Sequence, residues 1–232
     1  MRDFNYSTIR EQKWDSEILG LIAAIYKEAG KQELYLKQRP DELEKLVEIA
    51  KIQSTEASNA IEGIVTTNTR IRQLVEEKTT PRNKDEQEIA GYRDVLSIIH
   101  ESFDAIPLIL QLHKIMYSHM NNPMAGQIKN VQNYISATYP DGHTEILFTP
   151  LAPFETPKAL DRICEEYNRV IGNMELEPLI AVPVFIHDFL CIHPFNDGNG
   201  RMSRLLTTLL WVLRWQIHFS GSQDREKQGF VL

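Results

Sequence analysis

The most informative segment of the chain covers residues 193–204 and reads His-Pro-Phe-Asn-Asp-Gly-Asn-Gly-Arg-Met-Ser-Arg. Apolar residues at helical spacing on both sides predict helices over 178–192 and 199–215, joined by this loop. Gly198 and Gly200 let the backbone turn tightly, and the first amides of the following helix point at whatever lies in front of them. The segment therefore predicts an anion-binding loop at a helix N-terminus.

Four charged or titratable side chains in this loop indicate the kind of anion. Arg201 and Arg204 lie three residues apart, hence on one helix face, and each can form paired hydrogen bonds with phosphate oxygens. Asp197 offers a carboxylate of the kind that holds Mg²⁺ beside phosphates. His193, with an ordinary pKa near ~6.5, can accept a proton from an attacking hydroxyl. Together they predict a Mg-polyphosphate ligand and phosphoryl or nucleotidyl transfer.

Taken one at a time, the same residues have ordinary structural explanations. Gly198 and Gly200 would form a simple turn, His193 would be a packed core histidine, and Asp197 and the arginines would form surface ion pairs. The combination of these residues within twelve positions at a helix entry favours the chemical interpretation over the structural one.

The rest of the chain has a helical pattern almost throughout. Apolar spacing, with Pro, Gly or Asn at most joints, predicts further helices over 16–29, 40–53, 54–62, 69–77, 84–102, 107–119 and 155–172. The exception is Thr144 to Thr149, a short run of β-forming residues after Asp141-Gly142, which predicts a small hairpin. With no internal repeat, we expect one all-α domain that carries a small β-hairpin.

Composition limits the class of partner. The 232 residues are 42% apolar, enough to fill a core, and at a net charge of −7 no general electrostatic attraction to nucleic acid or anionic lipid is expected. No apolar stretch reaches the ~18 residues of a membrane span and no apolar segment follows the basic start, so we expect a cytoplasmic protein. Cys164 and Cys191 are expected to be buried, inert thiols, and His187 a packing histidine.

Residues 193–204 match, at every defined position, the signature His-Pro-Phe-x-Asp-Gly-Asn-Gly-Arg-x-x-Arg of the Fic family, which the chain resembles over about 15–213. The resemblance implies the helical Fic fold and AMPylation, the transfer of AMP from ATP to a protein Ser, Thr or Tyr hydroxyl with Mg²⁺. The Gly-Asn-Gly-Arg form is similar to nucleotidyl-transferring members, whereas the Doc kinase branch carries Lys in the loop.

The resemblance also implies a role for each loop residue. His193 would deprotonate the target hydroxyl, which attacks the α-phosphorus so that pyrophosphate leaves. The remaining residues would hold the Mg-nucleotide: Asp197 the Mg²⁺, Asn199 and the amides of Gly198 and Gly200 the α-phosphate, Arg201 the phosphates in general and Arg204 the γ-phosphate.

A second segment resembles the inhibitory helix of class II Fic proteins, written Ser/Thr-x-x-x-Glu-Gly/Asn. It runs from Ser58 to Glu62 and Gly63, and Gly63 stands where a left-handed residue ends a helix. The resemblance makes Glu62 the partner of Arg204, so that ATP is turned away and the enzyme is autoinhibited. Alternatively, Glu62 orients water onto an AMP-modified side chain, and the protein is a de-AMPylating hydrolase.

The predicted hairpin resembles the Fic flap, whose extended edge pairs with a target segment beside the nucleotide. The resemblance places Thr144, Glu145, Ile146 and Leu147 among the candidate nucleotide-binding residues, and a protein substrate, including the chain itself, is expected to dock around 144–149. The continuation through Pro150 to Pro153 lacks the adjacent prolines common after a Fic flap.

These assignments divide the chain into an N-terminal helical segment that packs on the core (1–53), the inhibitory helix (54–63), the Fic core (64–213) and an atypical tail (214–232). The tail lacks the family's next amphipathic helix and is polar from Ser220 to Gly229, so we expect a truncated or disordered end. An exposed apolar strip is then expected, which homo-oligomerisation would cover, along Leu205, Leu206, Leu209, Leu210 and Val212. A catalytically silent Fic-fold binding module is a further alternative.

Overall fold

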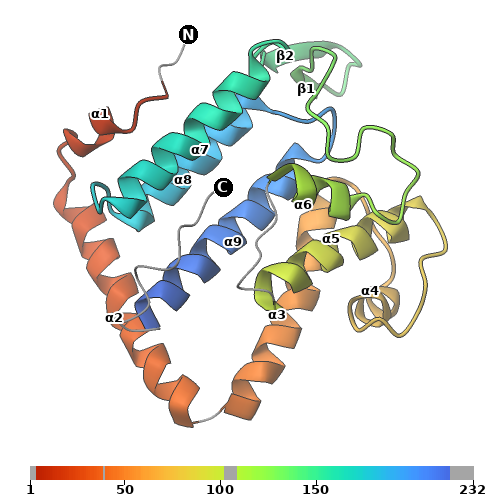
Figure 1. Cartoon of the computed structure of the whole chain (residues 1–232). Coiled ribbons are helices and arrows are strands. Elements are labelled where there is room, and N and C mark those ends of the chain that lie inside the picture. The colour runs from red at the N-terminus through yellow and green to blue at the C-terminus, as the bar shows by residue number, and fades with distance from the viewer. Residues whose placement is uncertain (1–3, 39, 102–108, 220–232) are drawn as a thin grey trace.

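A computed structural model of the chain describes residues 4–38, 40–101 and 109–219. Within this part, α9 runs through the middle of the molecule, α7 and α8 lie on one side of it, and α5 and α6 lie on the other (Figure 1). In chain order the elements are α1 (Ser7–Arg10), α2 (Ser16–Gln38), α3 (Pro40–Ile61), α4 (Asn68–Val75), α5 (Lys84–Glu101), α6 (Ile109–Met116), β1 (Ile135–Thr138), β2 (Thr144–Phe148), α7 (Thr156–Gly172), α8 (Pro178–Ile192) and α9 (Asn199–Phe219). The expected all-α fold is confirmed.

The main core surrounds α9. Phe185 and Phe189 of α8 are fully buried against it, and α5 and α3 pack on its other faces. The expectation of an exposed apolar strip on α9 is therefore wrong. The four leucines of this strip are at most 2% exposed, and Val212 is half-buried. Because neighbouring helices cover this face, it supplies no argument for a homo-oligomer.

The predicted ends of the two N-terminal helices need correction. α2 continues through Gly30 to Gln38, and α3 runs unbroken from Pro40 to Ile61, with no boundary between residues 53 and 54. Gly30 does not stop the helix because a glycine inside a helix costs only about 1 kcal/mol relative to alanine, and the residues around it favour helix. The motif predicted as a separate inhibitory helix is the last part of α3.

The C-terminal end also differs from its prediction. α9 extends to Phe219, past the predicted end at 215. The expectation of a disordered end over 220–232 lies outside the described residues. Among the helices of the described ranges, none has both the length and the apolar character of a membrane span.

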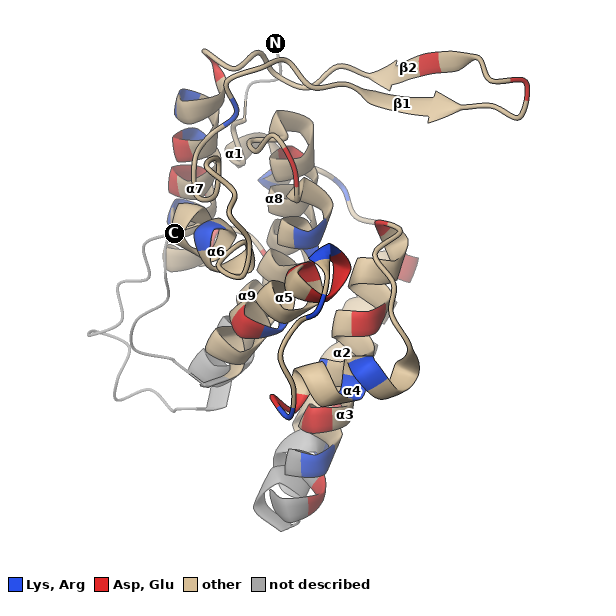
Figure 2. Cartoon of the chain, turned by 90° about the vertical axis from the view of Figure 1, so that its right-hand side faces the viewer, with Lys and Arg blue, Asp and Glu red and all other residues tan. Residues whose placement is uncertain are grey.

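The predicted hairpin is confirmed, and its first strand is now defined. β1 and β2 pair antiparallel with Thr138 opposite Thr144, and Gly142 in the turn has a φ of +85°. All five residues of β2 are exposed. The hairpin projects beyond the helical body (Figure 2).

A buried ion pair fastens α4 to α5. Nη2 of Arg70 lies 2.5 Å from the Glu86 carboxylate, which also accepts the backbone N–H of Arg82 at 2.9 Å. The hydrogen bond from Arg70 lowers the pKa of Glu86 to about 2, although burial acts in the opposite direction. This carboxylate is therefore charged in the folded protein at any ordinary pH.

Helices α5 and α6 approach closely at Gly91. A Cβ atom at this position would overlap the backbone carbonyl of Met116. Because backbone cannot move aside as a flexible side chain can, the close approach requires glycine. This contact fixes the position of α6 beside the loop that follows α8.

Candidate active site

Helix α8 ends in a left-handed residue that carries the candidate base. His193 has a φ of 53° and a ψ of 62°, and its N–H donates to the carbonyl of Phe189 at 2.8 Å. A residue with a side chain in this region costs of order 1–3 kcal/mol and persists only where its surroundings hold it. Contacts with the backbone on both sides of His193 must therefore hold this conformation.

Residues 129–133 hold that backbone. The N–H of Lys129 donates to the carbonyl of Pro194 at 2.8 Å, and its Nζ donates to the carbonyl of Ile192 at 3.0 Å. Asn133 donates to the carbonyl of Phe195 at 3.0 Å and accepts from Lys129 at 3.0 Å. Burial lowers the pKa of Lys129 to about 8. Because β1 begins two residues later, the same segment connects the loop to the hairpin.

The loop also closes on itself through Asn199. The Asn199 side chain accepts the N–H of Phe195 at 2.9 Å and donates to the Phe195 carbonyl at 2.8 Å. Gly198 has a φ of +80°, and a Cβ atom there would lie 2.9 Å from the Tyr117 hydroxyl. In this structure the Asn199 amide thus shapes the loop. The contact with the α-phosphate that the resemblance implies stays a prediction.

His113 of α6 supports the loop from the other side. Its Nδ1 accepts the N–H of Gly126 at 2.8 Å, so the proton of the neutral ring is on Nε2, which donates to the Asp197 carbonyl at 3.1 Å. Burial lowers the pKa of His113 to about 4, so the ring stays neutral. The ring also stacks on Phe195 with centroids 3.8 Å apart.

The half-buried side chain of His193 is prepared to accept a proton. Burial lowers its pKa, with a further lowering by the Lys129 charge, whereas the Leu190 carbonyl, Glu62 and Asp197 act in the opposite direction. An imidazole with a pKa below its ordinary value is neutral at pH 7. His193 is therefore in the protonation state that a general base requires.

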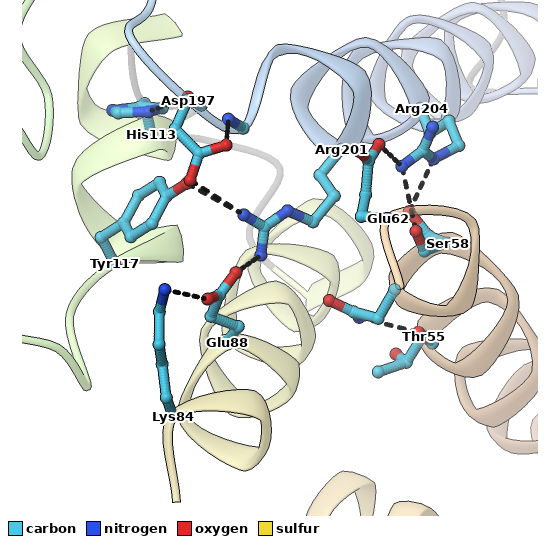
Figure 3. Close-up of polar contacts among 12 residues, drawn as sticks. Thr55, Ser58, Glu62, Lys84, Glu88, His113, Tyr117, Asp197, Arg201 and Arg204 are labelled. Atoms are coloured by element: carbon cyan, nitrogen blue, oxygen red, sulfur yellow. Dashed lines mark hydrogen bonds and ion pairs between the residues drawn. The ribbon is translucent and has the colours of Figure 1, made fainter. Parts of the chain in front are cut away.

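The two arginines of the loop lie in different surroundings (Figure 3). The side chain of Arg201 is 2% exposed, with Nη1 at 2.6 Å from the Glu88 carboxylate and Nη2 donating to the Tyr117 hydroxyl at 2.9 Å. The side chain of Arg204 is 30% exposed and faces α3. The expectation that both arginines share one helix surface does not match this arrangement, whereas their contacts with phosphate stay predictions.

The predicted pairing of Arg204 with Glu62 is present. Nη2 of Arg204 donates to Oε1 of Glu62 at 2.7 Å and to the Ser58 carbonyl at 3.0 Å, and Nε donates to the Ser58 hydroxyl at 2.7 Å. Three hydrogen bonds from one guanidinium thus join the start of α9 to the end of α3.

The end of α3 has a regular stop that places Glu62. Gly63 has a φ of +76°, its N–H donates to the Ala60 carbonyl, and the N–H of Ile64 donates to the Asn59 carbonyl, each at 3.0 Å. These two bonds form a Schellman motif, which requires a left-handed residue at Gly63. The sequence prediction for Gly63 is confirmed.

The Glu62 carboxylate lies directly against the N-terminus of α9. A Cβ atom at Gly200 would overlap Oε1 of Glu62. The first amides of a helix have no partner within it, and the helix dipole favours a negative charge at this end. The Glu62 carboxylate therefore lies at the end of α9 where a negative charge is favoured.

Two further expectations about side chains on α8 are wrong. His187 is exposed rather than packed, and Cys191 is half-buried with its Sγ 3.7 Å from Nδ1 of His187. These residues are four apart and share the outer face of α8, whereas Phe185 and Phe189 face the core. Cys164 is buried as expected, and burial raises its pKa to about 12.

The structure adds residues that the sequence did not assign to the site. They support the loop rather than face a ligand, and they are Glu88, His113, Tyr117, Lys129 and Asn133. The sequence indicates two of them, because His113 and Tyr117 are four residues apart within the helix predicted over 107–119, and this spacing places both on one helix face. The flap residues Thr144, Glu145, Ile146 and Leu147 remain exposed on β2.

Comparison with known proteins identifies relatives. The sequence model of the Fic/DOC family matches residues 103–211. Protein adenylyltransferase fic-1 of Caenorhabditis elegans is 26% identical over 118 residues, which cover 50% of this chain and 21% of that protein. Protein adenylyltransferase Fic of Nematostella vectensis is 24% identical over 176 residues, covering 71% of this chain and 38% of that protein. The chain thus spans less than two fifths of the length of either relative.

A solved structure agrees with these matches. A Fic domain containing signaling protein from Bacteroides thetaiotaomicron has a TM-score of 0.68 and 25% sequence identity, covering 81% of this chain and 72% of that chain. A Fic family protein from Desulfovibrio desulfuricans has a TM-score of 0.66 at 20% identity and so supports the fold alone.

Proposed function

Because residues 103–211 belong to the Fic/DOC family, we propose that this chain is a protein adenylyltransferase that transfers AMP from Mg-ATP to a Ser, Thr or Tyr hydroxyl. The observation that carries the proposal is the grouping, at the N-terminus of α9, of a neutral His193, the exposed carboxylate of Asp197 and the cation of Arg204. These are a base, a metal ligand and a phosphate ligand.

His193 begins the proposed reaction. The imidazole takes the proton of the target hydroxyl, and the hydroxyl oxygen bonds to the α-phosphorus of ATP. The bond from the α-phosphorus to the bridging oxygen breaks, and pyrophosphate leaves with the electron pair. The free amides at the start of α9 stabilise the charge that develops on the α-phosphate.

Asp197 fits a divalent cation. Its side chain is 74% exposed, and each carboxylate oxygen accepts one hydrogen bond, from Gly198 at 2.7 Å and from Tyr117 at 2.9 Å. Lone pairs therefore remain on both oxygens, and Mg²⁺ is commonly bound by one or two carboxylates together with substrate phosphates. Bound Mg²⁺ would neutralise charge on the phosphates.

The pair between Glu62 and Arg204 restrains this activity. While the carboxylate holds Arg204 and lies in front of α9, the γ-phosphate has neither the cation nor the space that it needs. When Glu62 moves away, both the cation and the space become available to the γ-phosphate. The proposed resting state is therefore autoinhibited, with Glu62 as the inhibitory residue and Ser58 as its support.

The projecting hairpin is the proposed docking site for the protein substrate. Its strand β2 is exposed, and Ile146 and Leu147 present apolar side chains together with backbone that a target segment can pair with. Residues 129–133 connect this strand pair to the backbone around His193. A target on the hairpin would therefore lie next to the loop, and a second copy of the chain is a candidate target.

Transfer from ATP labelled at the α-phosphate and, separately, at the γ-phosphate tests the proposal. We expect protein to acquire only the α-label, and more of it in Glu62→Gly than in the unmodified chain. His193→Ala should abolish labelling both in the unmodified chain and in Glu62→Gly. Label from the γ-phosphate would instead identify a kinase. Absence of both labels would favour the hydrolase, detected as release of AMP from a modified protein, or the silent binding module.

A further inference from the structure

A chain of buried polar contacts leads from α5 to the candidate metal ligand. Glu88 of α5 pairs with Arg201 at 2.6 Å, Arg201 donates to the Tyr117 hydroxyl at 2.9 Å, and this hydroxyl donates to Oδ2 of Asp197 at 2.9 Å. We call these four residues the Asp197 relay (Figure 3). The relay connects α5, α9 and the residue directly after α6 to the loop that follows α8.

The direction of each hydrogen bond in the relay is determined by its chemistry. A guanidinium can only donate, so the Tyr117 oxygen accepts from Arg201. The single hydroxyl proton of Tyr117 is then available for the carboxylate of Asp197, which can only accept when charged. Arg201 also lies over the Tyr117 ring, 5.5 Å from its centroid, which limits movement of the ring. Tyr117 therefore presents its proton to Asp197 in one orientation.

The exposure of the four side chains changes sharply along the relay. Arg201 and Glu88 are 2% and 6% exposed, whereas Asp197 is 74% exposed. A buried charge pair that loses one partner leaves an uncompensated charge, so Glu88 and Arg201 hold each other in place. The buried end is thus rigid, and the exposed end presents a carboxylate whose free lone pairs face solvent.

This arrangement separates the functions of the two arginines. A residue that binds phosphate must reach the nucleotide, and Arg204 lies at the surface beside the Glu62 carboxylate. Arg201 is buried, and its guanidinium is engaged by Glu88 and Tyr117. The geometry therefore assigns phosphate binding to Arg204 and a different task to Arg201.

We infer that Tyr117, held by Arg201 and Glu88, is a positioning residue that orients the Asp197 carboxylate toward the divalent cation of the bound nucleotide. The inference rests on the proposed function, because it presupposes a Mg-nucleotide at Asp197. Residues that orient a metal ligand in this way typically change metal affinity by about 10- to 100-fold when they are removed.

Nucleotide affinity with and without a divalent cation tests this inference. Calorimetry would measure Kd for an ATP analogue with a methylene group between the α- and β-phosphates, once in EDTA and once in saturating Mn²⁺, using Glu62→Gly as the parent. The Kd in EDTA divided by the Kd in Mn²⁺ measures the contribution of the metal to binding. Tyr117→Phe is expected to reduce this ratio about tenfold and to leave the Kd in EDTA unchanged within about twofold, because the hydrogen bonds of the hydroxyl go to Arg201 and Asp197 rather than to Arg204 or the amides of the proposed phosphate site.

Two further variants complete the test. Tyr26→Phe is the matched control, since it removes a hydroxyl that donates to the carboxylate of Glu177 at 2.6 Å, where α8 begins; its ratio should equal that of the parent. Arg201→Lys keeps the charge but cannot reach both Glu88 and Tyr117 with the same geometry. It should reduce the ratio as well and preserve the Kd in EDTA. If Arg201 contacted phosphate instead, the substitution would weaken nucleotide binding in EDTA too.

The outcomes separate this inference from the function on which it rests. An unchanged ratio in Tyr117→Phe, with the parent still responding to Mn²⁺, would overturn the positioning role alone. A parent that binds the nucleotide equally well in EDTA and in Mn²⁺ would overturn both. Lower thermal stability of Tyr117→Phe with an unchanged ratio would indicate a purely structural hydroxyl and would also refute the inference.

Discussion

Removing the charge of Glu62 should strengthen ATP binding by an amount that the contacts of Arg204 allow us to estimate. In Glu62→Gln the side chain keeps its size and can still accept a neutral hydrogen bond from Arg204, but the negative charge in front of α9 is lost. The charge-assisted bond at 2.7 Å is weakened, and the guanidinium becomes available to a phosphate.

Two effects contribute to the expected magnitude. The side chains of Arg204 and Glu62 are 30% and 37% exposed, so their pairing is worth only about 0.5 to 1 kcal/mol. The carboxylate also repels the triphosphate, because two unit charges about 4 Å apart interact by about 1 kcal/mol even in water-like surroundings, and ATP carries several charges. Together these effects amount to about 2 kcal/mol, or about thirtyfold in Kd.

The assay is calorimetric titration with Mg-ATP at low and high salt. We expect the gain in Glu62→Gln to shrink at high salt, because both partners are partly exposed and their charges are screened. Glu48→Gln, which removes a charge from the same helix 14 residues earlier, is the matched control and should bind like the unmodified chain. A Kd for Glu62→Gln within about threefold of the unmodified value would refute the estimate and the inhibitory role that it rests on.

Two further predictions concern stability. The pKa of Glu86 is lowered to about 2 in the folded state from an ordinary value of 4.5, so its charge stabilises the protein above pH 4.5, and this contribution is lost as pH falls toward 2. The urea midpoints of the unmodified chain and of Glu86→Gln should therefore converge on acidification, and a difference that stays constant with pH would contradict the lowered pKa. Gly91→Ala should lower the free energy of unfolding by about 1–3 kcal/mol through overlap with Met116, whereas Gly20→Ala, in open helix, should raise it; equal melting temperatures would disprove the contact.

The local features of the site could be predicted from the sequence because they depend on neighbours in the chain. The helix limits of α8, the left-handed Gly63 and the loop from His193 to Arg204 follow from apolar spacing, glycine positions and short-range hydrogen bonds. The hairpin follows in the same way from β-forming residues and the Asp141-Gly142 turn. The pairing of Glu62 with Arg204 was predictable only because two distant motifs were matched to one family.

Other features were decided by how the helices pack. Whether an apolar face is core or surface depends on its neighbours, so the strip on α9 is buried while His187 on α8 is exposed. Lys129 and Asn133 reach the loop from more than 60 residues away in the chain. The burial of Arg201 follows from the approach of α5 and α6, which Gly91 permits. Periodicity along one helix carries no information about such contacts, because they exist only once separate helices are in place.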